Sequence, residues 1–273
     1  MKVEFDEQKQ EWIELEKDSP RGIYLDGYLK KKLDNIKMIQ RKDWDAFFGI
    51  DGVEGSGKST LSFICGYYLS NTRLGMNNVA EGTQDAIKKI EILPDESVLI
   101  IDEGSLSLSS KDVFNKEQKR LIQIMNVMRQ KKMVLIIVSP SFFDLNKYIS
   151  VHRTRFLLHV YTDKKLNRGR FAYFSEKKKN ILYEVGKKKH NSYSYPPSDF
   201  VGVFTNFIPT WYSRYLELKK RTLMIALKMA GKNGEPILDL TKEQRMIMLK
   251  SMQKHGISAT NEQKSLLLGV SDR

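Results

Sequence analysis

Short, continuous apolar runs recur through the middle of this chain. They are Ala46–Ile50, Val98–Ile101, Met133–Val138 and the run within Arg155–Tyr161. A strand that is apolar at every position has both of its faces buried, as happens in a parallel sheet covered by helices. These runs therefore predict the central strands of such a sheet.

Between these runs, apolar residues recur at helical spacing instead. The segments are Leu25–Ile39, Ser59–Ser70, Thr83–Ile92 and Lys116–Gln130. Strands that alternate with helices indicate an α/β fold, here a mainly parallel sheet with helices on both faces. We expect this core to span residues 44–161.

The flanking segments have a different character. Residues 1–43 are predicted to form an N-terminal helical extension, with a possible short helix in the polar first 20 residues. Residues 162–200 predict a basic β-hairpin, with strands at Arg170–Phe174 and Asn180–Val185.

Residues 201–273 predict a helical C-terminal region, with a helix over Trp211–Ala230. Thr241 to Gln244 fits a capping box, and a second helix is expected over Asn261–Leu268. The stretch 267–271 resembles the turn of a partial helix-turn-helix, but we favour the simpler interpretation, a plain helical hairpin.

Charge and composition narrow the classes of partner. The net charge of the 273 residues is +13, which favours a polyanionic partner, either nucleic acid or an anionic membrane surface. No apolar run approaches the roughly 20 residues of a spanning helix, so we expect no membrane span. The single cysteine, Cys65, excludes a disulfide within the chain and fits a cytoplasmic protein, or one in the host cytoplasm if the source is viral.

A phosphate-binding motif follows the first apolar run. It matches the pattern G-x-x-x-x-G-K-[ST] and, with the next residue, comprises Gly52, Val53, Glu54, Gly55, Ser56, Gly57, Lys58, Ser59 and Thr60. Its backbone N–H groups must curl around phosphates, which glycine permits. We expect Lys58 to reach the β- and γ-phosphates of ATP, and the Ser59 hydroxyl to bind Mg²⁺.

Two carboxylates end the second apolar run. Asp102 is expected to hold Mg²⁺, and Glu103 to act as the general base that activates the attacking water. Residues at the carboxyl end of a parallel strand face the ligand crevice, which is where these roles require them. Charged residues are rarely buried without a partner, so an acidic pair at the end of a buried strand indicates a functional role.

Further catalytic candidates are less sharply defined. Ser139 ends the third apolar run and is expected near the γ-phosphate, provided that its strand lies beside that of Asp102. An arginine that neutralises developing charge, often from a neighbouring subunit, is sought in the order Arg129, Arg155, Arg153. Taken singly, each of these arginines is better explained as a structural or solvated charge than as a catalytic one.

Residues 164–190 carry the densest positive charge. They contain ten Lys or Arg residues against the two acids Glu176 and Glu184. Aromatic residues are interleaved with them: Phe171, Tyr173, Phe174 and Tyr183. Lysines on one rim and aromatic rings on a sheet face would suit a nucleic-acid backbone, with little readout of sequence.

The order of these motifs resembles the additional-strand P-loop motor ATPases over roughly residues 44–161. Within that division the chain looks most like FtsK/HerA-type ATPases, viral DNA-packaging ATPases and zonula-occludens-toxin-like proteins, the last through Met128 to Lys132 followed by Val134–Ser139. It departs from them in two ways. Ser139 stands where FtsK/HerA proteins usually carry Gln, and the membrane span of the toxin-like proteins is not seen.

The resemblance implies a homo-oligomeric ring with ATP bound between subunits. We therefore expect an Mg²⁺-dependent ATPase motor that translocates or packages DNA, with double-stranded DNA as its partner and a viral or mobile-element source. Two alternatives stay open: a helicase or replication-associated ATPase, and an ATP-dependent switch or scaffold with slow turnover.

Overall fold

The structure, a computed structural model, describes residues 1–19, 21–102, 125 and 128–221. The chain divides into two units, Met1–Trp211 and Tyr212–Arg273. Residues 212–221 of the second unit are described and are helical. Within that helix the rings of Tyr212 and Tyr215 lie 5.7 Å apart.

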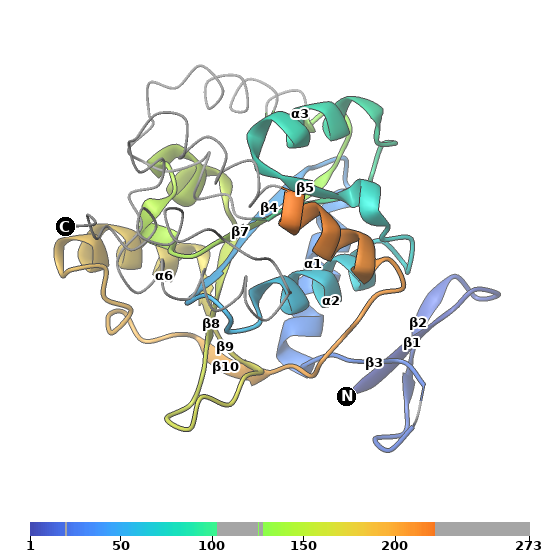
Figure 1. The fold of residues 1–273 in the computed structure, drawn as a ribbon, viewed down its shortest axis with the longest axis horizontal. Helices are drawn as coiled ribbons and strands as arrows, with labels where there is room; N and C mark the ends of the chain where they lie inside the picture. The colour runs from blue at the N-terminus through green and yellow to red at the C-terminus, as the bar shows by residue number, and fades with distance from the viewer. Residues whose placement is uncertain (20, 103–124, 126–127, 222–273) are drawn as a thin grey trace, which may run out of the picture. The chain divides into compact units, whose positions relative to one another are not determined.

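A seven-stranded sheet forms the centre of the first unit (Figure 1). Its strand order is β10-β9-β8-β4-β7-β6-β5. In that order the strands are Phe200–Val203, Arg170–Ser175, Phe156–Tyr161, Ala46–Gly52, Val134–Ser139, Val98–Asp102 and Val79–Glu81. All neighbours from β8 to β5 run parallel. β9 and β10 extend the sheet in the antiparallel sense. The predicted, mainly parallel sheet is confirmed.

Strand β7 lies between β4 and β6 and pairs with both in parallel. An additional strand thus separates the strand that enters the phosphate-binding motif from the strand that ends in Asp102. The ends of β4, β6 and β7 meet at one edge of the sheet because parallel strands share their direction. This edge carries most of the predicted site.

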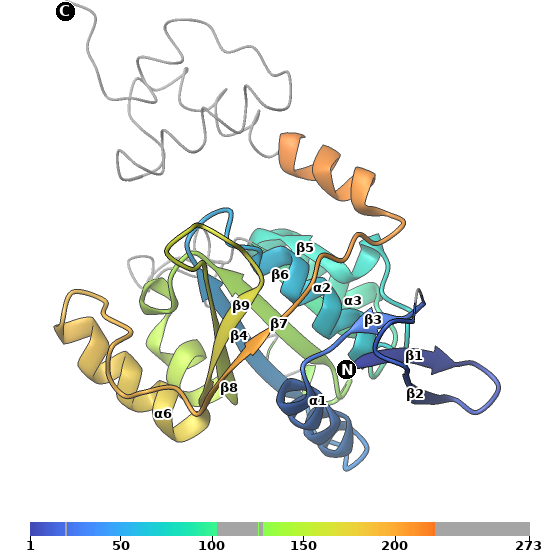
Figure 2. The same ribbon diagram turned by 90° about the horizontal axis from the view of Figure 1, so that it is seen from below.

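Helices cover both faces of the sheet, as the sequence predicts. α1 (Gly27–Gln40) and α2 (Lys58–Leu69) pack on one face, and α3 (Gly82–Ile92) and α6 (Glu176–Ile181) pack on the other. Figure 2 shows α1 and α6 on opposite sides of the strands. α1 begins where Asp26 accepts hydrogen bonds from the Tyr28 and Leu29 amides. Short helical turns complete the described helices: η1 (Met76–Asn78), η3 (Phe142–Asp144), η4 (Tyr148–Arg153) and η5 (Leu182–Gly186).

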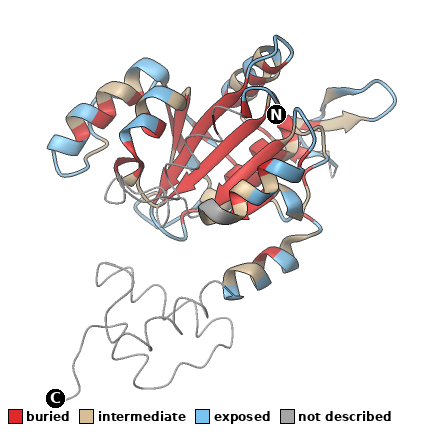
Figure 3. Ribbon diagram, turned by 90° about the horizontal axis from the view of Figure 1, so that it is seen from above, coloured by how far each residue is buried: buried red, intermediate tan, exposed pale blue. Residues whose placement is uncertain are grey.

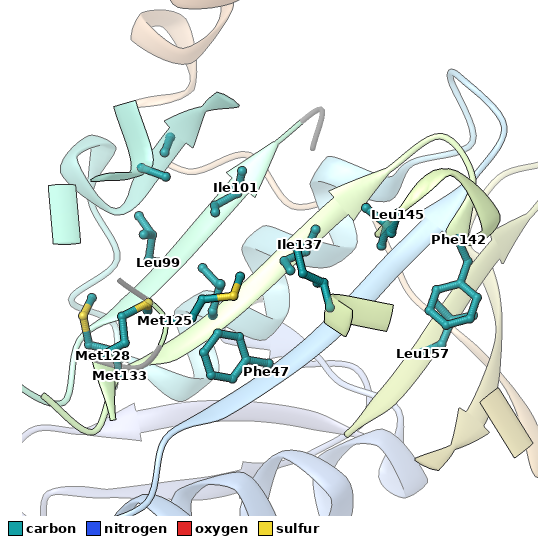
Figure 4. Packing of buried hydrophobic residues seen from close by; sticks show 14 of the residues in the cluster. Phe47, Leu99, Ile101, Met125, Met128, Met133, Ile137, Phe142, Leu145 and Leu157 are labelled. Carbon is teal, nitrogen blue, oxygen red and sulfur yellow. The ribbon is translucent and has the colours of Figure 1, made fainter. Parts of the chain in front are cut away.

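The central strands β4, β6 and β7 are buried along their whole length (Figure 3). Alternate residues of the strands meet the helices of one face in a large apolar cluster (Figure 4). The cluster includes Phe47, Leu99, Ile137 and Leu157 from the strands, and Met125 and Met128 from the segment predicted to be helical over 116–130. Most of that predicted helix, and the C-terminal elements beyond residue 221, lie outside the described residues.

The expectation of a short helix in the first 20 residues is wrong. β1 (Lys2–Asp6), β2 (Glu11–Leu15) and β3 (Ile23–Tyr24) form a separate three-stranded antiparallel sheet. The Trp12 indole anchors this sheet by donating hydrogen bonds to the Tyr68 carbonyl and the Asn71 side chain, at 3.1 and 3.2 Å. Cross-strand pairing, which a single segment does not reveal, decides the conformation here.

The prediction of a second strand in the basic hairpin, over Asn180–Val185, is also wrong. β9 matches the first strand, but residues 176–186 are helical, as α6 and η5. The buried positions Lys179, Leu182, Tyr183 and Gly186 follow a helical period. A lysine at a core position concealed that period. The antiparallel hairpin that does form joins β8 to β9.

In the part of the chain that the structure describes, no helix is both long and apolar enough to cross a bilayer.

Candidate active site at the carboxyl edge of the sheet

The phosphate-binding motif forms a loop between β4 and α2. Gly52, Gly55 and Gly57 have φ values of 138°, 75° and 108°, which residues other than glycine adopt only with strain. A Cβ added at Gly52 would lie 2.0 Å from the Val160 carbonyl oxygen of β8. The glycines therefore allow both the curl of the loop and its close contact with the neighbouring strand.

Lys58 begins α2 and folds back over this loop. Its Nζ donates to the carbonyl oxygens of Gly52 and Val53, at 2.8 and 3.0 Å. The ammonium group is thus held within the turn of the loop rather than directed away from it. A cation in this position beside loop amides provides the electrostatics of an anion site.

Ser59 and Asp102 are brought together across the sheet edge. The Ser59 hydroxyl donates to Oδ2 of Asp102, at 3.2 Å, and the Asp102 residue is only 2% exposed. Two hard oxygen ligands beside a phosphate site suit Mg²⁺, which takes few protein ligands and completes its shell with water and phosphate oxygens. Among the described residues no group of three His, Cys, Asp or Glu side chains forms an independent metal site.

The remaining predicted residues differ in their placement. Thr60 follows Ser59 in the first turn of α2, and Glu103 lies outside the described residues. Ser139 ends β7, and its buried hydroxyl donates to the Ser141 carbonyl oxygen at 2.9 Å. Because β7 pairs with β6, the condition set for Ser139 from the sequence is met.

The three arginine candidates lie at the opposite end of β4. Arg153 forms an ion pair with the buried Asp45 at 2.7 Å, and the Arg155 side chain donates to the Asp45 carbonyl oxygen at 3.4 Å. Arg129 lies over the ring of Trp44, 4.9 Å from its centroid. The seven residues of β4 place this group roughly 20 Å from the phosphate loop of the same chain.

A buried polar cluster beneath the phosphate loop was not predicted. Asp51, only 1% exposed, lies 3.0 Å from Nδ1 of His159 and accepts the Phe142 amide at 2.9 Å. The Tyr193 hydroxyl also donates to Asp51, and its ring stacks on His159 with centroids 3.8 Å apart. Burial, followed by the charge of Asp51, raises the pKa of Tyr193, which remains a neutral donor.

This cluster connects four segments at the start of the loop. The only sequence signal for it is an aspartate within an otherwise apolar strand, because His159 and Tyr193 are more than 100 residues further along the chain. We describe Asp51 as a positioning residue, since it fixes the end of β4 against β8 and against the turn that follows Ser139.

The segment after β10 packs along the phosphate loop and α2. The Phe204 ring would lie 3.1 Å from a Cβ added at Gly57. Phe207 contacts the ring of Tyr67, and Trp211 contacts Phe63 while donating to the Leu74 carbonyl oxygen at 2.9 Å. We call residues 204–211 the covering segment.

The aromatic residues of the basic region are not available to nucleic acid. Phe171, Tyr173, Phe174 and Tyr183 are between 0% and 5% exposed and belong to the core. Lys179 is fully buried as well. The exposed basic side chains of this region are Lys164, Lys165, Arg168, Arg170, Lys177, Lys187, Lys188 and Lys189. The expected aromatic face is therefore corrected to a charged surface without exposed rings.

Comparison by sequence finds neither a matching family model nor a matching curated protein.

Solved structures offer remote similarities. The N-terminal domain of zonular occludens toxin from Neisseria meningitidis is 13% identical over 63% of this chain and 98% of its own, with a TM-score of 0.37. The genome packaging NTPase B204 from Sulfolobus turreted icosahedral virus 2, in complex with AMPPCP, is 12% identical over 60% and 98%, with a TM-score of 0.37. A DNA polymerase III gamma subunit-related protein from Thermotoga maritima is 14% identical over 86% and 69%, again with a TM-score of 0.37.

At these values the fold is established by the chain's own strand order and loop geometry. A parallel sheet with a strand inserted between β4 and β6 carries a glycine loop, a lysine and a Ser–Asp pair on one edge. The described core therefore has the P-loop NTPase fold, with an additional strand between β4 and β6.

Proposed function

We propose that this protein is an Mg²⁺-dependent ATPase motor that translocates or packages DNA, from a virus or a mobile element. The observation that carries the proposal is the approach of Ser59 to Asp102, at 3.2 Å, beside a glycine loop that holds Lys58. A loop that bound no nucleotide would not need a buried carboxylate from another strand at the first turn of its helix.

Each residue of the proposed nucleotide site has a separate role in ATP hydrolysis. The loop amides and Lys58 bind and orient the β- and γ-phosphates of ATP, which supplies most of the catalysis in phosphoryl transfer. Ser59 and Asp102 would hold Mg²⁺, and the bound ion would neutralise charge on the phosphate oxygens. Ser139 lies near the γ-phosphate at the same edge of the sheet. Glu103 acts as the general base that takes a proton from the attacking water.

The charge of the molecule supports a polyanionic substrate. The net charge of +13 and the exposed lysines of residues 164–189 suit a sugar-phosphate backbone. Duplex DNA is the proposed track, and a homo-oligomeric ring is the proposed assembly. Arg129 is the arginine candidate best suited to a neighbouring active site, because it is exposed while Arg153 is engaged by Asp45.

The decisive experiment measures ATP hydrolysis with and without duplex DNA, together with binding of a non-hydrolysable ATP analogue. Glu103→Gln is expected to lower turnover by about 100-fold or more while binding persists, because it removes a general base. Lys58→Ala is expected to weaken both binding and turnover. Lys42→Ala, an exposed lysine beyond α1, serves as the control and is expected to change neither.

The alternatives predict different results. Strand separation coupled to hydrolysis would identify a helicase. Tight binding with turnover that neither DNA nor Glu103→Gln changes would identify a switch or scaffold. Failure of the wild-type protein to bind the analogue would refute the proposal as a whole.

A further inference from the structure

An arginine that the sequence did not single out lies beside the phosphate loop. Arg168 belongs to the turn between β8 and β9, residues 162–169, and an end of its guanidinium group, Nη2, is 3.8 Å from where a Cβ of Gly55 would lie. Both Arg168 and Gly55 are exposed to solvent. Within the part of the chain that the structure describes, Arg168 makes no ion pair and no side-chain hydrogen bond.

The turn that carries Arg168 is held by its own hydrogen bonds. One oxygen of Asp163 accepts the amides of Lys165 and Asn167, both at 2.9 Å, and the other accepts the Asn167 side chain at 2.9 Å. The Asn167 side chain, as the largest contribution, lowers the pKa of Asp163, so this carboxylate stays ionised and continues to accept these bonds near neutral pH. The backbone of the turn is thus defined before any ligand binds.

The turn is also fixed against the phosphate loop. The Gly169 carbonyl oxygen accepts the Phe204 amide at 2.8 Å, and Gly169 has a φ of 96°. A Cβ at Gly169 would lie 2.5 Å from the Phe204 carbonyl oxygen, so only glycine allows this contact. Phe204 in turn rests on Gly57. A short packed path therefore sets the position of Arg168 relative to the loop.

We propose that Arg168 binds the phosphates of the nucleotide held by the phosphate loop, and that it does so within its own chain. This inference rests on the proposed nucleotide site and names a further residue of it. A guanidinium presents several N–H donors in a fixed plane that matches phosphate oxygens. Arg168 thus lies at the phosphate loop of its own chain, whereas Arg129, Arg153 and Arg155 lie at the far end of β4.

The test compares two positive charges on one turn. Arg168→Ala is expected to weaken binding of AMPPCP with Mg²⁺ by about tenfold or more, because a charge-assisted hydrogen bond to phosphate is lost. Lys165→Ala removes an equal charge from the same turn and is expected to change that affinity by less than about twofold, as for a screened surface charge. Arg168→Lys is expected to retain part of the affinity.

The outcomes separate this inference from the proposed function. Wild-type binding of AMPPCP with equal binding by Arg168→Ala would overturn the role of Arg168 and leave the nucleotide site standing. A loss of duplex DNA affinity without a loss of AMPPCP affinity would assign Arg168 to the nucleic-acid backbone instead. If Arg168→Ala fails to fold, as judged by thermal unfolding, the contrast between Arg168→Lys and Lys165→Ala decides, since equal affinities there would also overturn the proposal.

Discussion

At the scale of single residues, Asp51 illustrates how one buried carboxylate organises a site without belonging to it. Its oxygens are shared by the Phe142 amide, the Tyr193 hydroxyl and His159. A buried acceptor with several donors is expensive to remove, because each donor is then left without a partner. The end of β4 and the first glycine of the loop depend on this cluster.

Asp51→Ala is therefore expected to lower the free energy of unfolding by about 3 kcal/mol, as for the loss of a buried, hydrogen-bonded charge. Tyr193→Phe removes only one donor and is expected to cost about 1 kcal/mol. Chemical denaturation of both variants measures the difference. Similar, small costs for the two variants would mean that Asp51 does not hold the cluster together.

Long-range clusters of this kind are what the sequence does not predict. Asp51, His159 and Tyr193 lie on three segments, and no local pattern joins them. Arg168 was likewise hidden, because its approach to Gly55 results from the antiparallel pairing of β8 with β9. The phosphate loop itself was predictable, since its chemistry is carried by consecutive residues.

At the scale of elements, α6 shows why the helical spacing of buried residues can be missed in a sequence. Its buried face includes Lys179, whose Nζ donates to the carbonyl oxygens of Ser150 and Val151 at 2.7 and 2.9 Å. The apolar stem of the lysine fills a core position while its head satisfies the end of η4. By contrast, β4, β6, β7 and β8 were predicted to within two residues, because strands buried on both faces are apolar throughout.

Lys179 has a measurable consequence for stability. Burial lowers its pKa to about 8, whereas the group in the unfolded chain keeps a value near 10.5. Between these values the unfolded chain binds more protons than the folded one, so this lysine makes stability rise with pH.

The free energy of unfolding is therefore expected to increase more steeply between pH 8 and 10 in the wild type than in Lys179→Met. Denaturation series at several pH values measure both slopes, and the slope comparison holds even where the variant is less stable overall. Parallel slopes would show that Lys179 does not titrate in this range.

At the scale of the whole molecule, excess positive charge predicts how the proposed binding to DNA depends on salt concentration. If the run Lys187 to Lys189 contacts phosphates, replacing all three with Gln is expected to reduce the slope of log affinity against log salt by up to about 2.7. Replacing the exposed Lys9, Lys17 and Lys42 with Gln changes net charge equally and serves as the control. Fluorescence anisotropy with a short duplex at several salt concentrations gives both slopes, and equal slopes would remove this run from the interface.

The covering segment has a mechanical consequence. Phe204 packs against Gly57, the glycine before Lys58. Phe207 and Trp211 pack against α2. The chain then continues directly into Tyr212, the first residue of the second unit. Packed side chains do not deform gradually, because close-packed groups transmit displacement to their neighbours. A displacement of the phosphate loop on ligand binding would thus be transmitted through the covering segment to the covalent link with the C-terminal unit.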